Sequence, residues 1–145
     1  MVQLRKAELR YHLTTRHYAQ LAAWRRALRA FLRFSEGAAA QVGLGAQQYQ
    51  SMLVIRGWAE PRPVTIGDLA RELYIKHNSA VGLVDRLVQQ RIMTRATSSA
   101  DRRKVELALT PRGRTVLATL AALHRHELQR LGPVFNRFFV EISRQ

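Results

Sequence analysis

The chain has 145 residues, 47% of them hydrophobic, and 24 Lys and Arg residues stand against 10 Asp and Glu. This length fits one domain, and this apolar content is enough to bury a core and excludes global disorder. The absence of cysteine excludes a disulfide framework, a thiolate zinc site and a thiol redox sensor. Apolar runs are only a few residues long, so we expect no membrane span, no secretory signal and a cytoplasmic protein.

The formal net charge of +14 attracts polyanions, which leaves nucleic acid, an anionic membrane surface and acidic small molecules as partners. The only lysines are Lys6, Lys76 and Lys104, so nearly all of the positive charge is arginine. Arginine suits bidentate contacts with phosphate and guanine edges. An arginine-biased genome would make the same choice, so the charge alone does not identify the polyanion.

The first half of the chain predicts two helices. Apolar residues recur at helical spacing from Leu13 to Phe34, and a helix that long exceeds what a small domain needs, so part of it should pack on a partner. The segments 35–37 and 43–45 contain glycine and predict the break that follows. A second helix is expected from Ala46 to Trp58, ended by the prolines of segment 61–63. Its expected inner face is Tyr49, Met52, Leu53, Ile55 and Arg56.

A helix-turn-helix follows. Thr65 and Asp68 have the spacing of a capping box that opens a short helix ending near Leu73. A tight turn over residues 74–76 leads to a second helix from about His77 to Gln90. Its apolar stripe predicts a buried face, made of Ala80, Leu83, Val84, Leu87 and Val88. The opposite face is polar, made of Asn78, Ser79, Gly82, Arg86, Gln89 and Gln90.

The apolar spacing then changes to that of strands. Residues 92–96 and 104–109 read as two short strands, the second with strict alternation, around the polar and basic loop 97–103. Thr110 and Pro111 mark the start of a helix expected to reach about Leu131. We expect the Gly132–Pro133 pair to end it, with a last amphipathic helix carrying Val134, Phe135, Phe138, Phe139 and Ile142.

These elements together indicate a DNA-binding surface. A helix-turn-helix places its second helix in the major groove, with N-terminal residues at the base edges, and the basic hairpin beside it has the form of a wing for the minor groove. An ordinary helical hairpin with a solvated polar face would share the first pattern, but not the adjacent wing. Asp101 is a poor DNA contact and a good brace for a neighbouring arginine. The predicted DNA-binding residues are Lys76, His77, Asn78, Ser79, Gly82, Arg86, Arg102 and Arg103.

The order of four motifs resembles the MarR family of transcriptional regulators. They are Leu69-Ala70, Val84-Asp85-Arg86-Leu87, Asp101-Arg102-Arg103 and Leu109-Thr110-Pro111-Arg112-Gly113. The resemblance implies a mainly α winged helix-turn-helix fold with a small β-hairpin wing. It implies one unit over 1–145, with dimerisation helices at about 1–40 and 111–145 and a DNA-binding module at about 46–110. It further implies a homodimer on a pseudo-palindromic operator, usually a repressor released by a small, often aromatic, anionic ligand.

Three further expectations depend on the family's pattern. The family places its ligand pocket between the dimerisation helices and the winged module, and Tyr18, Arg25 and Trp58 are the candidates to line it here. Trp24 lies on the apolar stripe, and core packing is the better interpretation for it. Members usually carry glycine where this chain has Arg91, and a polar or basic residue where it has Gly82. The sequence therefore does not decide the conformation of the turn at Arg91 or whether Gly82 lies at a base contact.

Catalysis has no support in the sequence. The chain has no cysteine nucleophile, no phosphate-binding glycine loop after a strand and no carboxylate pair beside a histidine. The histidine pairs 12/17 and 124/126 have poor spacing for chelation, so we expect no metal, no cofactor and no enzyme activity. The alternative function is a basic module that binds RNA or an anionic membrane surface. A-form RNA hides its major groove from a recognition helix, and membrane binding would gather aromatic and basic residues on one amphipathic helix.

Overall fold

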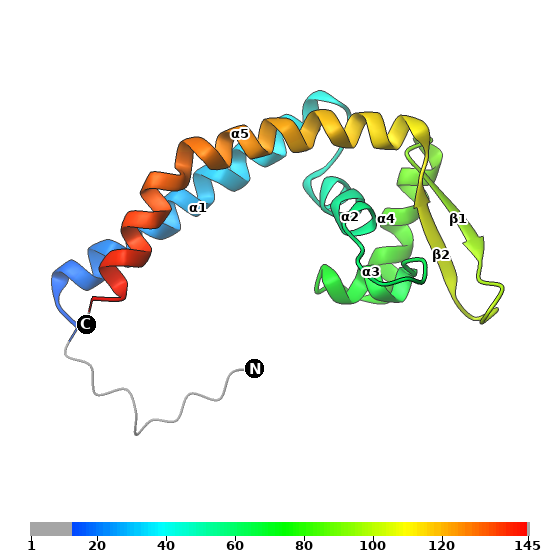
Figure 1. Cartoon of the computed structure of the whole chain (residues 1–145), viewed down its shortest axis with the longest axis horizontal. Coiled ribbons are helices and arrows are strands. Elements are labelled where there is room, and N and C mark those ends of the chain that lie inside the picture. The colour runs from blue at the N-terminus through cyan, green and yellow to red at the C-terminus, as the bar shows by residue number, and fades with distance from the viewer. Residues whose placement is uncertain (1–12, 145) are drawn as a thin grey trace, which may run out of the picture.

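The computed structural model describes residues 13–144. It consists of two long helices and a small module of shorter elements. In chain order the elements are α1 (Thr15–Gln41), α2 (Ala46–Arg56), α3 (Ile66–Glu72), α4 (His77–Gln89), β1 (Met93–Thr97), β2 (Val105–Leu109) and α5 (Pro111–Ile142). Figure 1 shows α1 and α5 lying side by side and antiparallel, with the other elements gathered at one end of the pair. The expected winged helix-turn-helix fold is confirmed. Residues 1–12, part of the expected N-terminal dimerisation segment and including His12, lie outside the described residues.

The first helix is longer than the sequence predicted. The break expected at residues 35–37 is absent, because Ser35, Ala38 and Ala39 face inward and are buried. The hydroxyl of Ser35 lies 2.8 Å from Nε2 of His124 in α5, which ties this turn of α1 to the other long helix. The second expected break is present: α1 ends at Gln41, and Gly43 adopts a left-handed φ of 75°.

The last helix also runs through its expected end. Gly132 and Pro133 do not stop it, and α5 continues to Ile142 with Pro133 inside. Proline in a helix removes one backbone hydrogen bond and its ring clashes with the Cβ of the preceding residue. Gly132 has no Cβ, which lowers that cost. The far segment is also held against α1, where Trp24 packs on Phe138 with ring centroids 5.7 Å apart. Figure 1 shows the two helices curving together over this half.

The buried face of α2 differs in part from the expected one. Its buried residues are Gln48, Tyr49, Ser51 and Met52. Leu53 is 41% exposed, and Arg56 is exposed as well. Tyr49 and Met52 were placed correctly. The helix is polar on more than one side, so its apolar pattern alone did not define the inner face.

The helix-turn-helix has the expected boundaries and caps. The Thr65 hydroxyl accepts a hydrogen bond from the backbone N–H of Asp68 at 3.2 Å, and the Asp68 carboxylate accepts one from the N–H of Thr65 at 2.9 Å. This is the predicted capping box. The turn between α3 and α4 passes through Tyr74, which has a φ of 53°. As expected, α4 buries Ala80, Leu83, Val84 and Leu87.

The wing is a two-stranded antiparallel hairpin whose base joins the core. Pairing runs from Met93 opposite Leu109 to Thr97 opposite Val105, so β1 begins and ends one residue later than predicted. Leu107 and Leu109 of β2 are buried, which confirms the alternation. The N–H of Leu107 also donates to the carbonyl of Val64 at 2.9 Å, which fastens the hairpin to the strand-like segment before α3.

The turn at Arg91 has the left-handed backbone conformation, although this chain has no glycine there. Arg91 has a φ of 59°, a conformation that costs a side-chain-bearing residue roughly 1 kcal/mol. Its carbonyl accepts a hydrogen bond from the Thr110 hydroxyl at 2.7 Å, so the turn is tied to the start of α5. Thr110 also caps α5 by accepting from the N–H of Gly113, and Pro111 begins the helix as predicted.

Candidate nucleic-acid interface

The N-terminal half of α4 presents a polar face to solvent. His77, Asn78 and Ser79 are exposed, while Ala80 in the next position is fully buried. Lys76 precedes the helix as its N-cap and is exposed. The buried stripe therefore fixes the rotation of α4, and the predicted base-reading residues lie on its outer side. An amide, a hydroxyl and an imidazole at the first turn have the donors and acceptors that base edges require.

Gly82 and Arg86 continue this face. A Cβ added at Gly82 would meet nothing within 4 Å, so the absent side chain leaves open space outside the helix and no packing defect inside it. Arg86 lies one turn further and is exposed. The structure thus gathers all six residues predicted on and just before α4 along one surface.

The wing tip is held by one carboxylate. Asp101 accepts from Nε and Nη2 of Arg103 at 3.1 and 3.2 Å, and from the backbone N–H of Arg103 at 3.1 Å. The hydrogen bonds from Arg103 and the nearby charge of Lys104 lower the pKa of Asp101. The predicted brace is therefore present. Arg103 remains 90% exposed despite it, and Arg102 beside it is exposed.

The wing loop is also ordered by its own backbone. Ser98 is buried, and its hydroxyl accepts from the N–H groups of Ala100 and Asp101 at 3.2 and 3.3 Å. The N–H of Lys104 donates to the carbonyl of Asp101 at 2.9 Å. The arginines at the tip are thus carried by a turn with a defined shape, which lowers the entropy lost when they bind.

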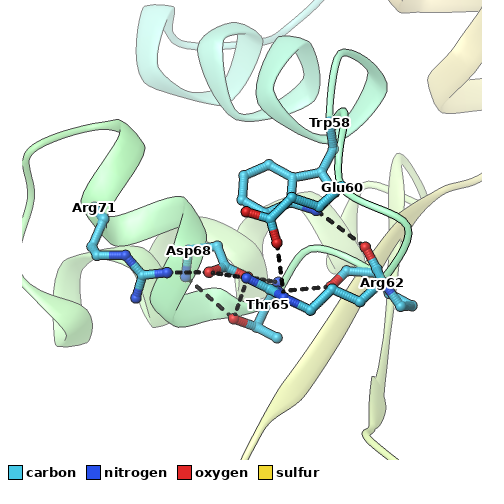
Figure 2. Close-up of polar contacts among 7 residues, drawn as sticks. Trp58, Glu60, Arg62, Thr65, Asp68 and Arg71 are labelled. Carbon is cyan, nitrogen blue, oxygen red and sulfur yellow. Dashed lines mark hydrogen bonds and ion pairs between the residues drawn. The ribbon is translucent and has the colours of Figure 1, made fainter.

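A second carboxylate organises the start of α3, and sequence reasoning missed most of its partners. Figure 2 shows Asp68 between Arg62 on one side and Arg71 on the other. Arg62 donates to Oδ2 at 2.5 Å and to Oδ1 at 3.0 Å, and Arg71 also donates to Oδ1. The Thr65 hydroxyl donates to Oδ2 at 2.8 Å. The hydrogen bonds from Arg62, followed by those from Thr65, hold the pKa of Asp68 far below its usual range.

The carboxylate at the centre of this cluster of Arg62, Asp68 and Arg71 is buried. Asp68 is only 2% exposed, whereas the side chains of Arg62 and Arg71 are 44% and 71% exposed. The buried anion therefore holds two partly exposed arginines, and Nε of Arg62 also pairs with Glu60 at 3.0 Å. The sequence contained one signal for this: Arg71 lies three residues after Asp68, which is helical contact distance. Nothing local predicts Arg62, which reaches Asp68 from the preceding loop.

The residues proposed to line a ligand pocket do not come together within one chain. Trp58 belongs to the loop after α2, where its Nε1 donates to the Arg62 carbonyl at 3.1 Å. The Arg62 guanidinium lies 5.4 Å from the centre of the Trp58 ring (Figure 2). Tyr18 and Arg25 lie on exposed positions of α1. The three residues line no common pocket of the single chain over residues 13–144, and their grouping stays a prediction.

The remaining aromatic and histidine residues have structural surroundings. Trp24 packs on Phe138, as expected for a core residue. His124 is buried and His126 exposed, which confirms that the two point to different faces. His17 accepts a hydrogen bond from the N–H of Thr14 at the start of α1. Among residues 13–144, no three His, Asp or Glu side chains are grouped as a metal site.

Comparison with known proteins agrees with this geometry. A sequence profile described as the MarR family matches residues 43–104, from the approach to α2 through the wing loop. The segment from the approach to α2 through the wing loop is therefore similar in sequence to the MarR family. The match confirms the resemblance seen in the sequence, and it covers both the helix-turn-helix and the wing arginines. No curated protein is similar enough in sequence to match the chain.

Several solved structures share most of this fold. AbsC, a MarR family transcriptional regulator from Streptomyces coelicolor, is 17% identical with a TM-score of 0.70, over 91% of this chain and 84% of AbsC. A variant of S. aureus MepR bound to an oligodeoxyribonucleotide is 14% identical with a TM-score of 0.65, over 87% and 93%. CouR from Rhodococcus jostii, bound to p-coumaroyl-CoA, is 23% identical with a TM-score of 0.66, over 81% and 85%. At these identities the likeness shows a shared fold.

None of the helices within residues 13–144 is both long and apolar enough to cross a membrane.

Proposed function

We propose that this chain is a transcriptional regulator that binds double-stranded DNA as a homodimer and has no enzyme activity. One observation carries the proposal: the exposed polar face of α4 and the exposed wing arginines belong to one module, which matches the MarR family. The net charge of +14 supplies the long-range attraction to DNA. The fold shared with a MepR variant bound to an oligodeoxyribonucleotide supports the same assignment.

The roles of the predicted residues follow from their positions. Asn78, Ser79 and His77 at the first turn of α4 read base edges in the major groove, and Gly82 allows the helix backbone to approach closely. Lys76 and Arg86 contact phosphates on either side. Arg102 and Arg103 enter the minor groove, where the negative potential attracts guanidinium groups.

The dimer is proposed to form through the long helices. Their apolar residues are left exposed in the single chain, which is the usual mark of an interface. These residues are Leu13, just before α1, and Leu21, Leu32, Leu123, Leu128, Val134, Phe139, Val140 and Ile142 within the helices. A groove of about 420 Å³ between α1 and α5 contains Trp24, Phe135 and Phe138. Segments 1–40 and 111–145 form the dimerisation part of this proposal and 46–110 the DNA-binding part.

The regulatory part of the proposal is a repressor released by a small aromatic anion. Its supports are the basic surface of this chain and the shared fold with CouR bound to p-coumaroyl-CoA. By linkage, a ligand that weakens DNA binding must bind the DNA-free dimer more tightly by the same factor. A panel of aromatic acids should therefore contain compounds that both raise the melting temperature and release DNA. If no acid does both, this regulatory part fails and the DNA-binding part stands.

The test of the function itself is a gel shift with duplex DNA from the region upstream of the chain's own gene. The proposal expects a shifted band that survives an excess of RNA competitor. Loss of the band to RNA, or tighter binding to anionic vesicles than to duplex DNA, would favour a basic module for RNA or membranes instead.

A further inference from the structure

A basic cleft lies between the wing and the helix-turn-helix. It has a volume of about 200 Å³ and is bordered by the start of α3, the first residue of α4 and the loop end of the wing, where β2 begins. Its cationic lining consists of Arg62, Arg71, Arg103 and Lys104, with His77 beside them. Asp68 is the only carboxylate in that lining. The positive charge in the cleft therefore exceeds the negative charge, although Asp68 is fully ionised.

Both carboxylate oxygens of Asp68 are already hydrogen-bonded, and its single negative charge does not cancel the positive charge of the cleft. Both of its oxygens already accept from Arg62, and Arg71 and Thr65 add further bonds. Arg71 remains 71% exposed, so part of its guanidinium is free to donate outward. A carboxylate that positions an arginine in this way reduces the freedom lost when that arginine binds an anion.

The geometry of B-DNA says which anion meets this cleft. Adjacent major and minor grooves of a duplex are separated by one sugar–phosphate strand. If α4 enters the major groove and the wing tip enters the neighbouring minor groove, that strand must pass between them. The cleft lies between α4 and the wing, so it faces the strand.

We propose that the cleft seats one phosphate of this strand, held jointly by Arg71 of α3 and Lys104, which lies in the wing loop just before β2. The inference rests on the proposed DNA-binding function and deepens it, because it adds two residues that are not among the predicted DNA-binding residues. Both contacts are to the backbone, so they should position the module and leave sequence preference unchanged.

The test is the double variant Arg71→Gln/Lys104→Gln, measured by fluorescence anisotropy over a range of salt concentrations. Each phosphate neutralised contributes about 0.9 to the slope of log affinity against log salt. One shared phosphate per protomer predicts that the slope of the dimer falls by about two. Affinity should fall about tenfold or more, equally on a preferred and a random duplex. An unchanged slope overturns the proposal, and so does a fall of nearly four, which would mean two separate phosphates per protomer.

The matched control is Arg29→Gln/Arg33→Gln, which removes the same charge from exposed positions of α1. It should leave the slope nearly unchanged. Urea unfolding checks that Arg62 still satisfies Asp68 in the test variant. If that variant is unstable, Lys104→Gln alone leaves the Asp68 cluster untouched, and binding at wild-type strength by this variant overturns the proposal. Failure of the wild-type chain to bind duplex DNA would instead refute the function on which the inference rests.

Discussion

The ring of Tyr49 in α2 stacks on the imidazole of His124 in α5, with centroids 4.2 Å apart and planes inclined by 23°. Nδ1 of His124 lies 2.7 Å from the Leu120 carbonyl, which can only accept, so this nitrogen carries the proton. Nε2 is then free to accept from the Ser35 hydroxyl in α1. This contact joins the winged module to both long helices.

Truncating the stacked ring should be costly. We expect Tyr49→Ala to lower the free energy of unfolding by about 3–5 kcal/mol, because it removes a buried aromatic ring and leaves a cavity beside His124. Tyr49→Phe keeps the stacked ring and should stay within about 1 kcal/mol of wild type. Urea unfolding measures both. Equal stability of the two variants would show that the ring contact contributes little.

Asp68 should make stability depend on pH. Its pKa is lowered in the folded chain, so it stabilises the fold fully above the unfolded-state value of about 4, and this stabilisation is lost progressively at lower pH. We expect Asp68→Asn to cost about 2 kcal/mol at neutral pH and the difference from wild type to shrink below pH ~4. Urea unfolding at a series of pH values measures this.

The control for that experiment is Asp85→Asn. Asp85 pairs with Arg95 on the surface, and the two side chains are 42% and 47% exposed. An exposed pair of this kind contributes less than about 1 kcal/mol. If Asp85→Asn costs as much as Asp68→Asn, burial is not what makes the Asp68 cluster important.

Two glycines offer opposite outcomes for the same substitution. A Cβ at Gly113, in the first turn of α5, would overlap the carbonyl oxygen of Ile92, the residue before β1, so Gly113→Ala should destabilise by about 1–3 kcal/mol. A Cβ at Gly37, inside α1, would meet nothing within 4 Å. Gly37→Ala should stabilise by about 0.5–1 kcal/mol through helix propensity. Thermal unfolding gives both signs, and a tolerated Gly113→Ala would contradict the packing described.

The molar mass of the protein in solution tests the proposed homodimer. Light scattering at micromolar concentration should give twice the chain mass of 16.6 kDa. Phe139→Asp/Val140→Asp places charges on α5 where the single chain leaves 53% and 50% of these side chains exposed, so the dimer should weaken. Leu53→Asp, at an exposed site of the winged module, should leave the mass unchanged. A well-folded wild-type monomer would refute the dimer.

Local signals in the sequence were read correctly where the structure depends on neighbours in the chain. The caps at Thr65 and Thr110 and the alternation in β2 were predicted because each is set within a few residues. The continuation of α5 through Pro133 was not predicted, because it depends on packing against α1 and on the missing Cβ of Gly132. The continuation of α1 past Ser35 depends in the same way on His124, 89 residues away.

In the candidate site, too, features set by neighbouring residues were predictable and contacts that form only in the folded chain were not. The face of α4 was predictable because its apolar stripe fixes which residues point outward. The Arg62 contact with Asp68 was not, since a loop arginine reaches its partner only once the fold has formed. The grouping of Tyr18, Arg25 and Trp58 stays a prediction, since no pattern in the sequence contains the distance between α1 and the module.

In the proposed complex with DNA, α4 reads bases while the wing binds the backbone beside the minor groove. The measurement that tests this arrangement most directly compares Asn78→Ala with Arg102→Ala on a preferred and a random duplex at several salt concentrations. Asn78→Ala should cost about 1–3 kcal/mol on the preferred duplex with little change on the random one. Arg102→Ala should weaken both and lower the salt slope by about two for the dimer. Identical behaviour of the two variants on both duplexes would contradict the division of labour between α4 and the wing.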